Sequence, residues 1–193
     1  MYICPQASDL QNSRSLTEEG FETHFGTNHL GHFVLCKLLL PKLLASQSAR
    51  IVIVSSALHR AGRPPDEDFA NWSTPKEKDY SAWDAYGASK LANVYMAQHL
   101  QVLMNEQKAD IIAVSLHPGV GPTGLGKEGL NGCARGCYKC VGALFMASWS
   151  QLAGTSVHVC MMSKDELIGK KFHTHFSLAV ALQLQKTFSI PNE

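Results

Sequence analysis

Two short apolar runs constrain the fold more than any other feature of this chain. Residues 50–56 read RIVIVSS, and residues 111–119 read IIAVSLHPG. Neither run alternates apolar with polar residues, which is typical of strands covered on both faces in a parallel sheet. Each run ends in small polar or turn-forming residues. The sequence therefore predicts two interior parallel strands with polar side chains at their carboxyl ends, where sites form in such sheets.

Helical patterns separate these strands. Apolar residues recur at intervals near four in residues 18–45, where Ser15 and Glu18 predict a capping box and Pro41 should kink or end the helix. A second helix is expected over residues 86–104. The order helix, strand, helix, strand predicts an α/β fold with a doubly wound parallel sheet, about three strands and flanking helices.

The rest of the chain is less regular. We expect residues 1–14 to form a loop and the polar segment 57–85 to pack over a functional site. Residues 120–136 form a glycine-rich loop in this interpretation. A helix near 137–161, a short strand near 170–173 and a tail from residue 174 complete it.

Composition narrows the class of protein. The chain has 193 residues, 45% of them hydrophobic, and a net charge of +1, which suits one globular core. Positive and negative charges nearly balance, so the chain has no strong positive electrostatic potential. Binding to nucleic acid through phosphate contacts is therefore not expected. No signal peptide is visible, and polar residues interrupt the apolar stretch 141–162, which we interpret as a buried helix. We therefore expect reduced thiols, and the sequence leaves open whether this intracellular protein is cytoplasmic or membrane-associated.

A metal site is weakly supported. Cys133, Cys137 and Cys140 form a C-x3-C-x2-C run to which Cys160 or His158 could add a fourth ligand. A closed zinc site needs four ligands, and no paired C-x-x-C occurs elsewhere. The same objection applies to three helical histidines that lack accompanying carboxylates, namely His24, His29 and His32. We predict no metal.

Tyr86 and Lys90 form the sharpest chemical pattern. At a spacing of four they share one helix face, and an ammonium near a phenol lowers its pKa from about 10. Such a tyrosine can give a proton to a carbonyl oxygen or take one from an alcohol. Ser56 at a strand end supplies a hydroxyl that can hold the substrate oxygen. Together the three predict an acid–base site at the edge of the sheet.

These residues lie in segments that resemble the short-chain dehydrogenase/reductase family, in the branch of the retinol dehydrogenases and the WW-domain oxidoreductase. The resemblance covers residues 15–172, leaving a divergent tail at 173–193 of a single partial Rossmann-like domain, 1–193. The matching segments, in order, are Thr17–Val34, Arg50–Arg60, Asp84–Val94, Leu116–Gly124 and residues 154–160.

The resemblance implies a catalytic tetrad. Asn28 would support a proton relay, Ser56 would polarise the substrate carbonyl, and Tyr86 would be the acid or base. Lys90 would lower the Tyr86 pKa and bind the nicotinamide ribose, so Tyr86 and Lys90 also contact the cofactor, NADP or NAD. The family's P-G-x-x-x-T turn beside the nicotinamide would be formed by Pro118, Gly119 and Thr123. The implied substrate is a small lipophilic alcohol or carbonyl, retinoid- or steroid-like.

The sequence departs from the family at one point. The family binds its dinucleotide through a glycine-rich turn after the first strand, and these residues contain none. The glycines of 124–132 follow the last matched motif and are read as a loop. The sequence thus matches the C-terminal, catalytic half of the fold, which predicts an N-terminal truncation and an unpaired edge at the Arg50–Ser56 strand.

Three hypotheses follow from this departure. The first is an oxidoreductase whose isolated 193-residue chain is inactive and binds cofactor poorly. The second is a truncated non-catalytic isoform or pseudo-enzyme that forms homo- or heterodimers with related chains through helices 18–45 and 86–104. The third, and weakest, is an unstable product without activity.

Overall fold

A parallel sheet forms the centre of the protein. The computed structural model describes residues 2–3, 13–46, 48–62, 73–119 and 149–169. Strands β2 (Ala49–Val54) and β3 (Ile111–Leu116) pair in parallel along their full length, with Ala49 opposite Ile111 and Val54 opposite Leu116. The predicted α/β fold with parallel strands is confirmed, although β3 lies at an edge of the described sheet.

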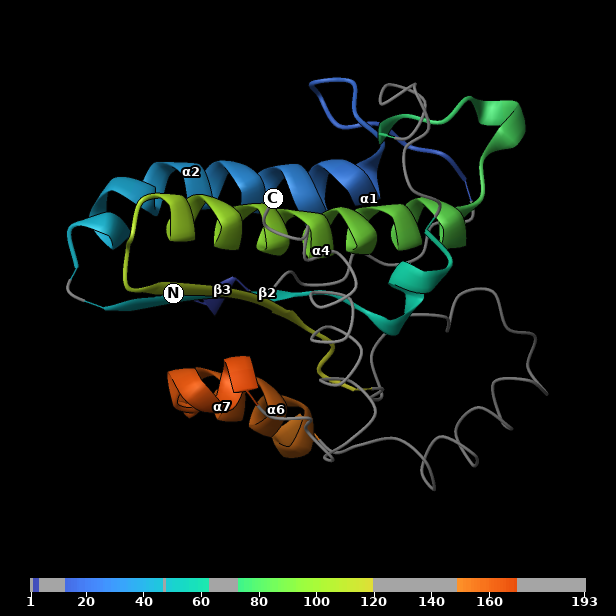
Figure 1. The fold of residues 1–193 in the computed structure, drawn as a ribbon. Coiled ribbons are helices and arrows are strands. Elements are labelled where there is room, and N and C mark those ends of the chain that lie inside the picture. The colour runs from blue at the N-terminus through green and yellow to red at the C-terminus, as the bar shows by residue number, and fades with distance from the viewer. Residues whose placement is uncertain (1, 4–12, 47, 63–72, 120–148, 170–193) are drawn as a thin grey trace, which may run out of the picture.

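Helices cover both faces of this sheet (Figure 1). The odd-numbered side chains Ile51 and Ile53 belong to one apolar cluster, and the even-numbered Val52 and Val54 belong to another. The first cluster includes residues of α2 (Gly31–Leu44) and α4 (Ala82–Glu106), the second residues of α6 (Trp149–Met161) and α7 (Lys164–Gly169) and nearby Met162. Because successive strand residues face opposite sides, a continuously apolar strand requires cover on both.

The loop predicted for residues 1–14 is wrong at Tyr2–Ile3, which form strand β1. This strand pairs in parallel with β2, Tyr2 opposite Val52 and Ile3 opposite Ile53. The sheet order is β1-β2-β3, so β2 is central in the described sheet. The unpaired edge expected at the Arg50–Ser56 strand is therefore wrong at Val52 and Ile53.

The first helical segment begins later than the capping-box pattern predicts. Residues 16 and 22 form an antiparallel bridge, and α1 (Thr23–Phe25) begins after Glu22, whose carboxylate accepts the Phe25 N–H at 2.8 Å. Ser15 bonds the Thr23 hydroxyl instead of capping a helix of its own. A π-helical turn, η1 (Gly26–Leu30), joins α1 to α2.

Pro41 does not end α2, contrary to one of the two predicted outcomes. The helix continues to Leu44 with Pro41 inside it and exposed. Pro41 has no backbone N–H, so the helix gives up one intrahelical bond there and still continues for three residues. After β2, the described residues form two short 3-10 turns, η2 (Ala57–Arg60) and η3 (Glu77–Asp79). The helix predicted over 86–104 is α4, which begins earlier because Ser81 caps it.

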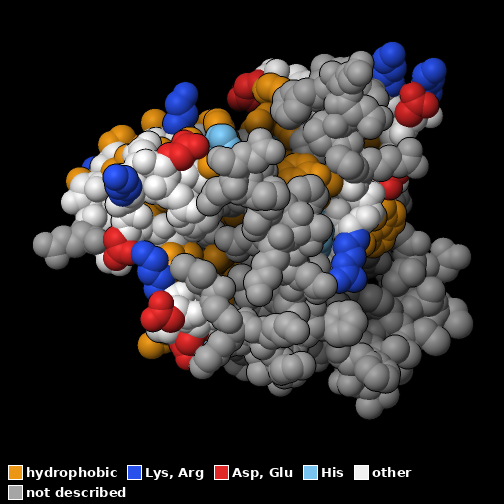
Figure 2. Space-filling model, viewed as in Figure 1, with side chains coloured by type: hydrophobic (Ala, Val, Ile, Leu, Met, Phe, Trp, Pro, Cys, Tyr) orange, Lys and Arg blue, Asp and Glu red, His pale blue; other side chains and the backbone are white. Residues whose placement is uncertain are grey.

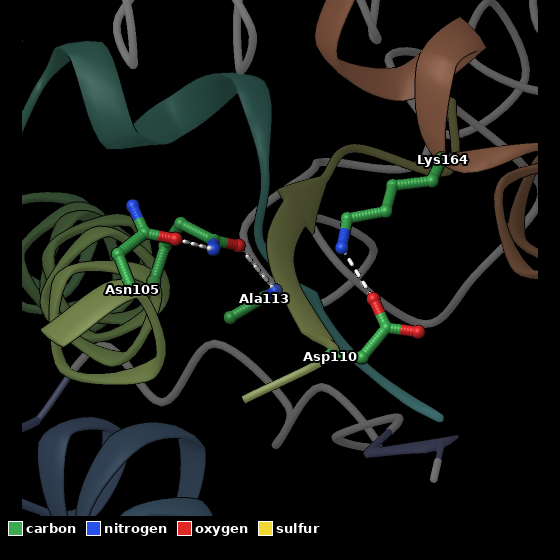
Figure 3. Close-up of polar contacts among 5 residues, drawn as sticks. Asn105, Asp110, Ala113 and Lys164 are labelled. Carbon is green, nitrogen blue, oxygen red and sulfur yellow. Dashed lines mark hydrogen bonds and ion pairs between the residues drawn. The ribbon is translucent and has the colours of Figure 1, made fainter. Parts of the chain in front are cut away.

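Polar contacts fasten both helical layers to the sheet (Figure 3). On the α4 side, the Gln101 side chain accepts the Ala113 N–H at 2.8 Å and donates to Asn105 at 2.8 Å. On the other side, Lys164 at the start of α7 forms an ion pair with Asp110, just before β3. Arg50 of β2 also donates to two carbonyls of α6, those of Val159 and Cys160.

Several sequence predictions concern residues outside the described part of the chain. The glycine-rich loop, residues 137–148 of the helix predicted at 137–161, the strand near 170–173 and the tail lie outside the described residues. Residues 149–161 of that helix are helical, as α6. Among the helices described, none combines the length and apolarity that crossing a bilayer demands.

We predict that Ile53→Ala lowers the free energy of unfolding by about 2–5 kcal/mol, because Ile53 is fully buried and its truncation leaves a cavity. Urea denaturation measures the change. Met161→Ala is the control: this side chain is 80% exposed, so its loss should change stability by no more than about 0.5 kcal/mol. Equal effects of the two substitutions would contradict the assigned core.

Candidate active site

The carboxyl ends of β2 and β3 bring the predicted polar residues to one edge of the sheet. The Ser55 N–H donates to Leu116 O at 2.7 Å, which ties the two strand ends together. The Ser55 hydroxyl donates to Lys90 O at 2.7 Å, which ties them to α4. The serine pair thus has two tasks, since Ser55 anchors the helix and Ser56 faces Tyr86.

Ser56, Tyr86 and Lys90 are brought together as the sequence predicts. The Ser56 and Tyr86 side chains share a hydrogen bond, and Lys90 Nζ lies 5.3 Å from the centroid of the Tyr86 ring. All three residues are buried. A hydroxyl, a phenol and an ammonium in one desolvated cluster can hold an oxygen atom and exchange a proton with it.

The predicted effect of Lys90 on Tyr86 is not what the structure has. Burial raises the pKa of Tyr86, and the Ser56 hydrogen bond offsets part of that rise. The ammonium of Lys90 lies over the ring face, where it interacts with the π system. The expectation of a lowered pKa is therefore wrong for this structure, in which Tyr86 is a protonated phenol at neutral pH.

Asn28 joins the cluster through Ser89. Asn28 lies in the π-helical turn, is fully buried, and donates from Nδ2 to the Ser89 hydroxyl at 3.2 Å. Ser89 in turn donates to Tyr86 O at 2.7 Å. Asn28 Oδ1 is buried without a hydrogen-bond partner among the described residues. A π-helical turn inside a helix often marks a functional site.

A backbone contact between glycines sets the approach of the two active-site segments. A Cβ added at Gly62 would lie 2.5 Å from Gly87 O, and one added at Gly87 would lie 2.9 Å from Gly62 N. The segment after Ser56 and the first turns of α4 therefore touch at the main chain. No other residue type fits Gly62 without moving one of the two segments.

Histidines surround the lysine. Burial is the main cause that lowers the pKa of His24, His32 and His117, and the positive charge of Lys90 lowers each further. His24 packs edge-on against the Tyr86 ring, with ring centroids 5.9 Å apart. Burial likewise lowers the pKa of His29. These imidazoles are neutral at pH 7.

The residues expected to contact a cofactor are described in part. Pro118 and Gly119 follow β3, and Gly119 has a φ of +109°, which glycine adopts without strain. Thr123 lies outside the described residues, as do Cys133, Cys137 and Cys140. In the described part of the chain, no three histidine, cysteine, aspartate or glutamate side chains gather as metal ligands would. Cys36 and Cys160 are free thiols.

Sequence reasoning missed Ser55, Ser89 and Asn93, which hold the cluster by hydrogen bonds. One signal could have identified two of them. Residues 86, 89, 90 and 93 are spaced three and four apart, so their side chains share one helix face. No sequence signal pointed to the π-helical turn around Asn28.

We predict that acid destabilises the folded chain in the window below pH 6.5. Unfolded histidines titrate near 6.5, and the pKa values of His24, His29, His32 and His117 are lower when folded. The unfolded state thus binds more protons as the pH falls, so stability is complete above 6.5 and declines below it.

Urea midpoints at pH 7.5, 6.5 and 5.5 measure this decline. His117→Gln should make it shallower, whereas His99→Gln should not, because His99 is exposed in the folded state. Constant midpoints across this range would show that the buried histidines do not titrate on unfolding.

The chain is similar to known proteins. The family model for short chain dehydrogenases matches residues 6–131. Human retinol dehydrogenase 13 is 46% identical over 117 residues, which are 60% of this chain and 34% of that protein. Mouse retinol dehydrogenase 12 is 38% identical over 160 residues, 82% of this chain and 47% of that one.

A solved structure is also similar. An uncharacterized protein from Mycobacterium paratuberculosis superimposes with a TM-score of 0.51 at 38% identity, covering 69% of this chain and 46% of that one. The chain spans between a third and a half of the length of these relatives. With the family model matching well over half of its residues, the chain belongs to the short-chain dehydrogenase family of oxidoreductases, in the retinol dehydrogenase-like branch.

Proposed function

We propose that this chain carries the catalytic half of an oxidoreductase that moves a hydride between NADP(H) or NAD(H) and a lipophilic alcohol or carbonyl, such as a retinoid- or steroid-like molecule. The hydrogen bond between Ser56 and Tyr86, with Lys90 over the ring, is the observation that carries the proposal. The family uses nicotinamide dinucleotides on small alcohols and carbonyls, and two of the relatives are retinol dehydrogenases.

The residues present fit the nicotinamide end of such a cofactor. Lys90 offers a buried ammonium to a ribose hydroxyl, and Gly119 lets the chain turn beside the ring without a side chain. No glycine-rich turn follows the first strand of these 193 residues. We therefore expect the 193-residue chain alone to bind dinucleotide weakly and to turn over slowly.

The chain's own residues account for the movement of the proton. Bound NADPH or NADH supplies the hydride to the carbonyl carbon. The Ser56 hydroxyl donates to the carbonyl oxygen, and the Tyr86 hydroxyl gives that oxygen its proton. The raised pKa of Tyr86 keeps this proton in place until the oxygen becomes basic. The Lys90 ammonium, 5.3 Å from the centroid of the Tyr86 ring, stays beside the phenolate that remains.

We predict that Tyr86→Phe lowers reductase activity by roughly 10²–10⁴-fold, the contribution of a positioned acid. The assay follows NADPH oxidation with retinaldehyde, for the protein isolated from its own cells and for the recombinant 193-residue chain. Tyr95→Phe, on the same helix, is the matched control and should keep full activity. Activity that survives Tyr86→Phe would refute the role of Tyr86. If the protein without this substitution has no reductase activity in either preparation, the oxidoreductase proposal is refuted.

A second candidate function is association with another chain of this family. Phe33, Val34 and Leu38 of α2 are 46%, 52% and 71% exposed, and Val102 of α4 is 51% exposed. Apolar side chains are visible at the surface where α2 runs (Figure 2). Exposed apolar side chains of this size support a protein contact. A dimer through these helices would not require catalysis.

We predict that Leu38→Lys weakens self-association at least tenfold, because a charge in a closed apolar contact is left without a partner. Sedimentation equilibrium measures the dimer dissociation constant. Met161→Lys, at an even more exposed position on α6 across the sheet, should leave the dissociation constant unchanged. A monomeric wild-type chain, or equal effects of both substitutions, would rule out this surface.

A further inference from the structure

Asn93 has its hydrogen bonds distributed over three parts of the active site. Its side chain is fully buried, and Nδ2 donates to Asn28 O at 3.0 Å and to Val54 O at 3.3 Å. Oδ1 pairs with His29 Nδ1 at 3.1 Å. Two carbonyl acceptors fix the orientation of the amide, so His29 must be the donor to Oδ1.

Each of these contacts reaches a segment that carries a candidate catalytic residue. Asn28 is itself one, Val54 precedes the serine pair, and Asn93 lies one helical turn after Lys90. The Asn28 carbonyl also accepts from His32 Nδ1 at 2.7 Å. Both lone pairs of this carbonyl are therefore occupied by side chains, which holds the π-helical turn in place from two sides.

We propose that Asn93 is a positioning residue, whose carboxamide fixes Asn28 and the Ser56 segment relative to Tyr86 and Lys90. The proposal rests on the function proposed above and adds to it a residue that acts through others. Its physical basis is the number of segments joined. One rigid amide links η1, the end of β2 and α4, so the four side chains keep one relative geometry without contact from Asn93 to the substrate.

The chain offers a matched control on the same helix. Gln101 is also an amide that ties α4 to the sheet, since its side chain accepts the Ala113 N–H, but it lies two turns farther from Lys90. Asn93→Leu and Gln101→Leu therefore each remove an amide contact between α4 and the sheet, at Val54 of β2 for Asn93 and at Ala113 of β3 for Gln101. A merely structural role for Asn93 would make the two variants alike.

Nuclear magnetic resonance of the 193-residue chain measures the hydrogen bonding of His29 and Tyr86 and does not require catalytic turnover. Nitrogen-15 shifts report the tautomer of His29, which is neutral because burial lowers its pKa. Carbon-13 labelled tyrosine reports hydrogen bonding at the Tyr86 hydroxyl, and Tyr86→Phe identifies its resonance. Because no activity is measured, failure of the reductase assay and failure of this proposal remain distinguishable.

In the wild type we expect His29 to carry its proton on Nδ1. Asn93→Leu should lose this tautomer and shift the Tyr86 Cζ resonance, whereas Gln101→Leu should change neither. Asn93→Ser, a smaller change, gives the same readout if the leucine variant does not fold. An unshifted Tyr86 resonance in a folded Asn93 variant, or an equal shift in Gln101→Leu, would overturn the proposal.

Discussion

The contact between the carboxyl end of β2 and helix α4 determines the rest of the site. Ser55 binds the carbonyl of Lys90, and Asn93 binds the carbonyl of Val54. These bonds join the buried carboxyl end of β2 to the helix that carries the phenol and the ammonium. Burial makes them consequential, because a donor or acceptor left unpaired there would cost about 1–3 kcal/mol.

Much of the fold could be predicted from the sequence, for a simple physical reason. The runs at 50–56 and 111–119 are mostly apolar and do not alternate with polar residues, and such a strand is stable only with helices on both faces. The i, i+4 relation of Tyr86 and Lys90 is likewise local geometry, so a helix brings the two together whatever else the chain does. Ser56 could be placed because parallel strands end at a common edge.

The remainder depended on interactions distant in sequence. Glu22 caps the first helix because a bridge between Leu16 and Glu22 interrupts the pattern that Ser15 and Glu18 suggest. The π-helical turn at Asn28 relies on bonds from Asn93, 65 residues away. The Tyr86 pKa depends on how deeply the fold buries the ring, an effect that outweighs the Ser56 hydrogen bond. None of these can be read from spacing.

The main-chain contact of Gly62 with Gly87 limits how this site can diversify. Where side chains pack against each other, a larger residue on one segment can be compensated by a smaller residue on the other. Here the main chains of the two segments touch directly. No residue is smaller than glycine, so neither position can make room for a larger neighbour. Variation in substrate preference must therefore arise in side chains and loops around this junction. Selection experiments that randomise the pocket would recover both glycines nearly unchanged.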